Sequence, residues 1–133
     1  MLQNTWLEAQ EDTPGRLADR WVNIDQAIIS TSDVSSIAYS MFNVDSATPT
    51  TAYLSTTFST TCVYTALRTD NYWKDLNGEL RDRTGYQVLM PFPASAFPRD
   101  SKHLQAEVTV TPATGDPFPI IYKFHVVKKL YGT

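Results

Sequence analysis

Apolar and polar residues alternate along most of the chain, and this period of two predicts β-strands. The clearest examples are residues 103–111 and 118–131, separated by the turn-forming sequence PATGDP at 112–117. The side chains expected to face the core are Leu104, Ala106, Val108 and Val110 in the first strand and Phe118, Ile120, Tyr122, Phe124 and Val126 in the second. We therefore expect these two strands to form an antiparallel hairpin.

Shorter runs of the same kind occur earlier in the chain. They predict strands at 17–24 and 36–45, one or two strands within 46–65, and a strand at 86–90 that ends at Pro91. Residues 36–45 are apolar on both faces, with Ile37, Tyr39 and Met41 on one and Ala38, Phe42 and Val44 on the other. We expect such a strand to be covered on both sides, or to have one face held against something outside the domain.

Two segments are expected to be irregular. Residues 66–85 form the longest polar stretch and are expected to hold one helical turn and a loop, with a hairpin-type turn at Asn77-Gly78. Residues 93–97 are expected to form a short crossover with Phe97 in the core. About seven short strands punctuated by Gly, Pro, Asn and Asp predict an all-β, antiparallel β-sandwich spanning residues 16–133.

Residues 1–15 differ from the rest of the chain because they are acidic and contain few apolar residues. We interpret them as an extended N-terminal arm that becomes ordered on a partner, with Trp6 and Leu7 as its contact residues. A frayed terminus without a role is the alternative. The same stretch lacks the basic and apolar regions of a secretory signal, so we expect synthesis in the cytoplasm.

Length and charge narrow the classes of function. The 133 residues suit one domain, and 11 basic against 14 acidic side chains give a net charge of −3. This balance disfavours nucleic-acid binding, which needs clustered Lys and Arg to neutralise phosphates. No apolar run reaches the ~18 residues that a membrane-spanning helix needs. We expect no nucleic-acid partner and no membrane partner.

Candidate chemistry is sparse. Cys62 is the only cysteine, which excludes an intrachain disulfide, and we interpret it as a small buried apolar side chain. His103 and His125 are expected on the surface or at a strand edge rather than as a metal pair. A calcium loop starting at Asp75 fails because Gly78 falls at position 4, where the pattern requires glycine at position 6. We expect no catalytic residue, no metal and no cofactor, and we rank a hydrolase last.

Tyr72 and Trp73 form the best candidate for an exposed aromatic pair, because they lie in the polar stretch 66–85. Trp and Tyr dominate the energetics of protein interfaces, so the pair is a candidate protein contact. Stacking on a sugar, as in a carbohydrate-binding module, is a second use of the same rings. Packing onto the core of the domain itself is a third.

Residues 30–127 resemble small proteins encoded among the structural genes of tailed bacteriophages and prophages. The resemblance rests on a run of the type TDxxW…DxTGY…AFP, which is followed by a hairpin with the residue order E…T…G…F. The matching residues are Thr69, Asp70, Trp73, Asp82, Thr84, Gly85, Tyr86, Ala96, Phe97, Pro98, Glu107, Thr111, Gly115 and Phe118. The chain departs from the pattern at Gln87, Val88 and Leu104. Residues 11–17, EDTPGRL, also resemble the opening of Ig-like phage tail-fibre and baseplate adaptors.

The resemblance implies a non-enzymatic virion structural protein with an Ig-like β-sandwich. A capsid cement (decoration) protein that stabilises the head shell through contacts with the major capsid protein is the first hypothesis. A head–tail connector, neck or tail component, bound to portal, neck or tail proteins, is the alternative, and a carbohydrate-binding module is less favoured. Other copies of the same chain are a further candidate partner, in a homo-oligomer, because phage shells recruit such proteins around local symmetry axes.

Overall fold

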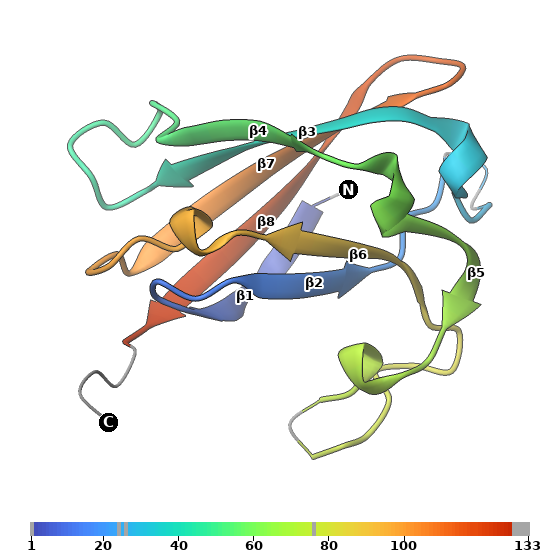
Figure 1. Cartoon of the computed structure of the whole chain (residues 1–133), viewed down its shortest axis with the longest axis horizontal. Coiled ribbons are helices and arrows are strands. Elements are labelled where there is room, and N and C mark those ends of the chain that lie inside the picture. Colours follow the sequence, from blue (N-terminus) through green and yellow to red (C-terminus); the bar gives the residue numbers. More distant parts are fainter. Residues whose placement is uncertain (1, 24, 26, 76, 129–133) are drawn as a thin grey trace.

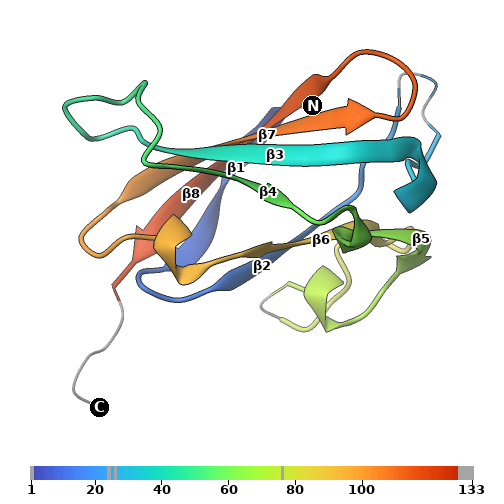
Figure 2. The same ribbon diagram turned by 45° about the horizontal axis from the view of Figure 1, so that its top comes forward.

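The computed structural model describes residues 2–128 except 24, 26 and 76, with side chains described from residue 7 onward. The described chain folds into two β-sheets packed face to face, shown in two orientations in Figures 1 and 2. The prediction of an all-β sandwich is confirmed at this level. No helix in the described residues is long and apolar enough to cross a membrane.

Among the described residues, one sheet has five strands and the other has three. The five-stranded sheet has the order β1-β8-β7-β3-β4, and the three-stranded sheet has the order β2-β6-β5. The strands are β1 (Leu2–Gln10), β2 (Gly15–Asp19), β3 (Val34–Asn43), β4 (Leu54–Phe58), β5 (Val63–Arg68), β6 (Tyr86–Phe92), β7 (His103–Pro112) and β8 (Phe118–Val127). The connecting segments contain the 3₁₀ turns η1 (Thr31–Asp33), η2 (Thr60–Cys62), η3 (Asn71–Trp73) and η4 (Ala94–Ala96).

The predicted closing hairpin is confirmed as β7 and β8, which pair antiparallel with Val108 opposite Ile120. Every second side chain of these strands faces the other sheet, as the period of two requires. All four predicted inward residues of β7 are fully buried. In β8, Ile120, Tyr122, Phe124 and Val126 are buried and Phe118 is partly exposed at the strand end.

The core lies between the two sheets and is rich in aromatic rings. Tyr39 of β3 stacks on Phe58 of β4 with ring centroids 4.1 Å apart, and both rings meet Phe92 of β6 edge-on. The predicted core residue Phe97 is buried beside Phe92 and Phe124. Such edge-on and stacked contacts add to the hydrophobic gain from burying the rings.

The apolar residues on the two faces of β3 have different surroundings. Ile37, Tyr39 and Met41 are buried in the core, whereas Ala38 is exposed on the outer face of the five-stranded sheet. Of the two expectations for this strand, coverage by the domain on both sides is therefore wrong. Contact of the outer face with something outside the domain stays a prediction.

The N-terminal segment is part of the five-stranded sheet. Strand β1 pairs parallel with β8, and its residues Leu7 and Ala9 pack against the core. The following residue Glu11 is buried, and its Oε2 accepts a hydrogen bond from the backbone amide of Asp100 at 2.9 Å. The structure thus places residues 2–10 of the expected arm in a strand that contributes side chains to the core.

Two predicted strand ends differ from the structure. The strand predicted at 17–24 ends at Asp19, because the chain then turns inward and buries Trp21 between the sheets. Strand β6 continues past Pro91 to Phe92. On one side of β6, Pro91 pairs with Arg16 of β2. On the other side, the pairing of β6 with β5 extends only to Val88, so Pro91 has no neighbour there. A proline is tolerated at this position because its missing N–H removes no hydrogen bond to a second strand.

Candidate functional site

The polar segment between β5 and β6 folds back onto the outer face of the three-stranded sheet. There Trp73 of η3 packs against Tyr86 of β6, with ring centroids 5.7 Å apart, and completes a second apolar cluster. The other members of this cluster are Ala18, Leu89 and the partly buried Tyr64. The predicted turn at Asn77-Gly78 is confirmed, with Gly78 at φ +79°.

Asp82 is the hydrogen-bonding centre of this loop. Its Oδ1 accepts from Trp73 Nε1 at 3.0 Å and from the backbone amides of Thr84 and Gly85 at 3.0 and 2.9 Å. Arg20 Nη1 of the segment after β2 donates to Asp82 Oδ2 at 2.8 Å. The amide of Gly85, then the indole of Trp73 and then Arg20, hold the pKa of this carboxyl well below its usual range.

Gly85 and Asp70 fix the loop at its other end. Gly85 has φ +93°, and a Cβ there would lie 2.3 Å from the carbonyl oxygen of Arg68, so only glycine fits. The Tyr86 hydroxyl lies 2.8 Å from both carboxylate oxygens of Asp70. Burial, followed by the Asp70 carboxylate, raises the pKa of Tyr86 to about 12. The TDxxW…DxTGY run noted in the sequence therefore closes and anchors a loop.

Four of the arginine side chains lie over aromatic rings on this side of the molecule. Arg68 lies over Tyr64 at 3.6 Å from the guanidinium carbon to the ring centroid, which is a close cation–π contact. The other contacts are Arg81 and Arg20 over Trp73 at 5.0 and 5.9 Å, and Arg16 over Tyr72 at 6.0 Å. We name the exposed part of this surface the arginine–aromatic face, defined by Arg16, Arg68, Arg81, Tyr64 and Tyr72.

The three arginines of this face differ from Arg20 in their partners. Arg20 forms an ion pair with Asp82, but no carboxylate in the described residues lies within ion-pair distance of Arg16, Arg68 or Arg81. All three are exposed. Arg16 lies between two depressions of about 280 and 220 Å³, the first also lined by Arg81 and the second also lined by Tyr64. The first depression is also lined by residues 7–10 of β1, among them Glu8, so the face combines three arginines and two tyrosines with one neighbouring carboxylate.

The predicted contact residues are separated by the fold. Tyr72 is 45% exposed, whereas Trp73 is 6% exposed and belongs to the second cluster. Trp73 thus packs onto the domain itself, which was one of the three uses considered for the pair. Leu7 is partly buried against the main core. Trp6 pairs with Lys123 through the β1–β8 ladder, and its side chain lies outside the described residues.

A second surface, the free edge of the five-stranded sheet at β4, carries no charged side chain. Strand β4 pairs regularly with β3 and ends the sheet. The sequence has no charged side chain between Asp45 and Arg68, so β4 contains no Lys, Asp, Glu or Pro, and its register has no bulge. Natural proteins usually protect exposed edges with such features, so an edge without them is a template for pairing with another strand.

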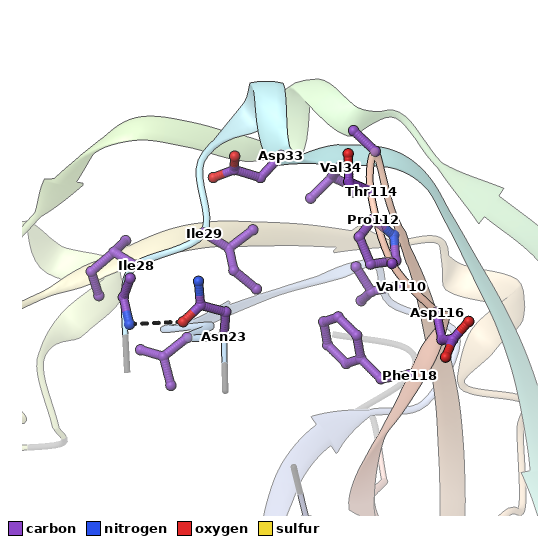
Figure 3. Close-up of a pocket in the computed structure, with 14 residues that line it drawn as sticks. Asn23, Ile28, Ile29, Asp33, Val34, Val110, Pro112, Thr114, Asp116 and Phe118 are labelled. Atoms are coloured by element: carbon purple, nitrogen blue, oxygen red, sulfur yellow. Dashed lines mark hydrogen bonds between the residues drawn. The ribbon is translucent and has the colours of Figure 1, made fainter. Parts of the chain in front are cut away.

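A cleft of about 910 Å³ opens at the end of the sandwich where the segment after β2 meets the β7–β8 turn (Figure 3). Its floor is apolar, and Figure 3 shows Ile29 and Phe118 pointing into it from opposite walls. The carboxylate of Asp116 on the rim points away from the cleft in the same view. This composition suits an apolar side chain of a partner more than a charged ligand.

The histidines and the cysteine are placed as follows. His103 and His125 are opposite each other in β7 and β8, and their rings stack with centroids 5.4 Å apart. His103 Nδ1 lies 2.9 Å from Asp45 Oδ2. Within the described part of the chain, no group of three or more His, Cys, Asp or Glu side chains is placed to hold a metal ion. Cys62 is buried, as predicted, and burial raises the pKa of its thiol to about 11.

In comparisons with known proteins, no family model, no curated protein and no solved structure matches this chain.

Proposed function

We propose that this protein is a non-enzymatic structural component of a tailed-phage virion, and specifically a capsid cement protein with an Ig-like fold. The observation that carries the proposal is the uncharged edge at β4. A cement protein needs a surface that attaches to neighbouring chains, and it needs no catalytic site. An unprotected strand edge provides backbone hydrogen bonds for such attachment.

The strand order supports the Ig-like assignment. In Ig domains one sheet contains strands G, F and C, extended by C′ in the variable type, and the other contains B, E and D. The order β8-β7-β3-β4 corresponds to G-F-C-C′, and β2-β6-β5 corresponds to B-E-D. Strand β1 adds to the G edge in parallel. The chain order of the eight strands agrees with this correspondence throughout.

The side chains of β4 suit strand addition. Ser55 and Thr57 are exposed on the outer face, where Ser55 Oγ already lies 2.9 Å from Ser40 Oγ of β3. Cross-strand hydroxyl pairs of this kind stabilise a sheet by ~0.2–1 kcal/mol each. An added strand with small polar residues would continue this outer face. On the inner face it would meet Leu54, which is partly buried, and the exposed Thr56.

Stabilisation of a shell by such contacts follows from mass action. A protein that binds the assembled shell and not its free subunits stabilises the assembly by RT ln(1 + [L]/Kd) per site, which is about 2.7 kcal/mol at a free concentration of 100 Kd. Repetition over many equivalent sites turns a moderate affinity into a large effect on the particle.

The experiment is co-sedimentation of the purified chain with shells of the encoding phage that lack it. We expect the wild-type chain to bind at many copies per shell, and Ser55→Lys/Thr57→Lys to lose binding, because charges on an edge prevent strand addition. The matched control is Thr109→Lys/Thr111→Lys, which places the same charges on the outer face of β7, away from the edge.

Equal binding by wild type and the β4 variant would refute attachment through this edge. Binding at a single vertex would replace the cement hypothesis with the head–tail connector. A sugar-binding module has less support, because Trp73 is buried under Arg20, Arg81 and Tyr86 and leaves no open pair of rings.

A further inference from the structure

We infer that the arginine–aromatic face is a binding site for an acidic protein segment, whose carboxylates are held by Arg16, Arg68 and Arg81. This site lies on the outer side of the three-stranded sheet and is separate from the β4 edge on which the proposed function rests.

The guanidinium groups are oriented before any ligand arrives. Arg68 is held over the ring of Tyr64 at 3.6 Å, and Arg81 over Trp73 at 5.0 Å. A stacked guanidinium keeps its N–H groups at the edge of its plane free to donate, and two of them match the two oxygens of a carboxylate. Because the side chain is already positioned, less conformational entropy is lost on binding.

Two carboxylates of the loop between β5 and β6 are held by other groups, and Glu8, which lines the same depression as Arg16 and Arg81, forms no ion pair with either arginine in the described residues. Asp82 accepts from Arg20, Trp73 and two backbone amides, and Asp70 accepts from the Tyr86 hydroxyl. Arg16, Arg68 and Arg81 have no ion-pair partner among the described residues. Although the chain has a net charge of −3, these three guanidinium groups without an ion-pair partner favour a ligand of opposite charge.

An acidic protein segment fits better than a nucleic acid. Single-stranded nucleic acids are bound through bases that stack on open aromatic faces. Here Arg68 covers Tyr64 and Trp73 is buried beneath two arginines, which leaves Tyr72 as the single exposed ring of the face and gives successive bases no row of rings to stack on. The acidic balance of the whole chain also opposes a polyanion longer than the face.

The shape of the face indicates how a segment would lie. The depression lined by Arg16 and Arg81 and the one lined by Arg16 and Tyr64 meet at Arg16. A segment crossing both would place Arg16 at its centre, with Arg81 on one side and Arg68 with Tyr64 on the other. Tyr72 is exposed at the rim and provides an apolar and hydrogen-bonding contact, as tyrosines do at interface hot spots.

The test is fluorescence anisotropy of the full chain with three labelled probes of equal length at low ionic strength. The probes are a glutamate–glycine peptide, a glutamine–glycine peptide and oligothymidine. We expect only the glutamate peptide to bind. Its affinity should fall about tenfold in Arg16→Gln/Arg68→Gln, through the loss of two charge-assisted contacts. Arg16→Lys/Arg68→Lys keeps the charge but loses the planar fork and should also weaken binding.

The matched control is Lys102→Gln/Lys128→Gln, which removes the same charge from two exposed lysines elsewhere and should leave the affinity unchanged. Circular dichroism of each variant checks that it is folded. Three results would overturn the inference: no binding of the glutamate peptide, equal weakening in the lysine control, or tighter binding of oligothymidine. Because no shell is present in this assay, its outcome is independent of co-sedimentation through β4.

Discussion

Gln87 of β6 is fully buried and joins the segment after β2 to the three-stranded sheet. Its Oε1 accepts from the Trp21 amide at 3.0 Å, and its Nε2 donates to the carbonyls of Trp21 and Ile29 at 2.5 and 2.9 Å. One side chain thus satisfies three backbone groups that form no part of a regular ladder. It also holds Ile29, which lines the cleft in Figure 3.

Replacing this side chain with leucine keeps its approximate volume and removes all three hydrogen bonds. A buried polar group left without a partner costs about 1–3 kcal/mol. The Trp21 carbonyl keeps the hydrogen bond that it accepts from the Ile29 amide at 3.1 Å, so only the Trp21 amide and the Ile29 carbonyl lose their partner. We therefore expect Gln87→Leu to lower the free energy of unfolding by about 2–6 kcal/mol, the sum of two such costs. This is a large part of the ~5–15 kcal/mol that stabilises a typical domain.

The assay is equilibrium urea unfolding followed by tryptophan fluorescence and by far-UV circular dichroism. Coincident transitions will show two-state behaviour, and the shift in midpoint at constant slope gives the change in stability. Gln105→Leu is the matched control, because the same change on the outer face of β7 removes no buried hydrogen bond and should stay within ~0.5 kcal/mol. A loss below ~1 kcal/mol in Gln87→Leu would show that this side chain does not anchor the segment.

Two further predictions concern the loop between β5 and β6. Gly85→Ala should destabilise the domain by about 3 kcal/mol or more in the same urea assay, because it combines a positive φ with a collision against the Arg68 carbonyl. Gly115→Ala is the control: Gly115 has φ +113° with open space around it, so the change should cost only about 1 kcal/mol. Equal costs for the two variants would refute the steric argument. The pKa of Asp82 is lowered in the folded state, so its contribution to stability is complete above the unfolded pKa of ~3.9 and is lost as the pH falls towards the folded value. Urea midpoints measured between pH 7 and pH 3 should therefore fall less steeply for Asp82→Asn than for wild type, and parallel profiles would contradict this assignment.

The sequence predicts those strands in which buried and exposed positions alternate as apolar and polar residues. Strands β7 and β8 alternate cleanly because one face of each meets the core and the other meets solvent. Strand β1 could not be predicted in this way. Its place in the sheet depends on parallel pairing with β8, more than a hundred residues away in the sequence, and residues 1–15 contain too few apolar positions to indicate it.

The site was predicted only in part, and for a similar reason. The position of Tyr72 in a polar stretch correctly indicated an exposed ring. The burial of Trp73 depends on Tyr86 and Asp82, which the fold brings under it from the far side of the same loop. The arginines were also missed as a group, because Arg16, Arg68 and Arg81 are distant in sequence and meet only when the loop covers the three-stranded sheet. The four-residue spacing of Tyr64 and Arg68 was the one local feature of the sequence that pointed to a contact between an arginine and an aromatic ring.

The two proposed contact surfaces lie on different sheets, and this separation has a consequence for function. Strand β4 ends the five-stranded sheet, whereas the arginine–aromatic face lies over β2, β5 and the loop that follows β5, which extends away from β4 in Figures 1 and 2. One small partner could not cover both surfaces, so a chain that uses both must join two neighbours. Once one contact has formed, the other becomes intramolecular, and its effective concentration then exceeds that of the free protein. Two modest contacts would therefore be sufficient for the proposed role as a cement protein.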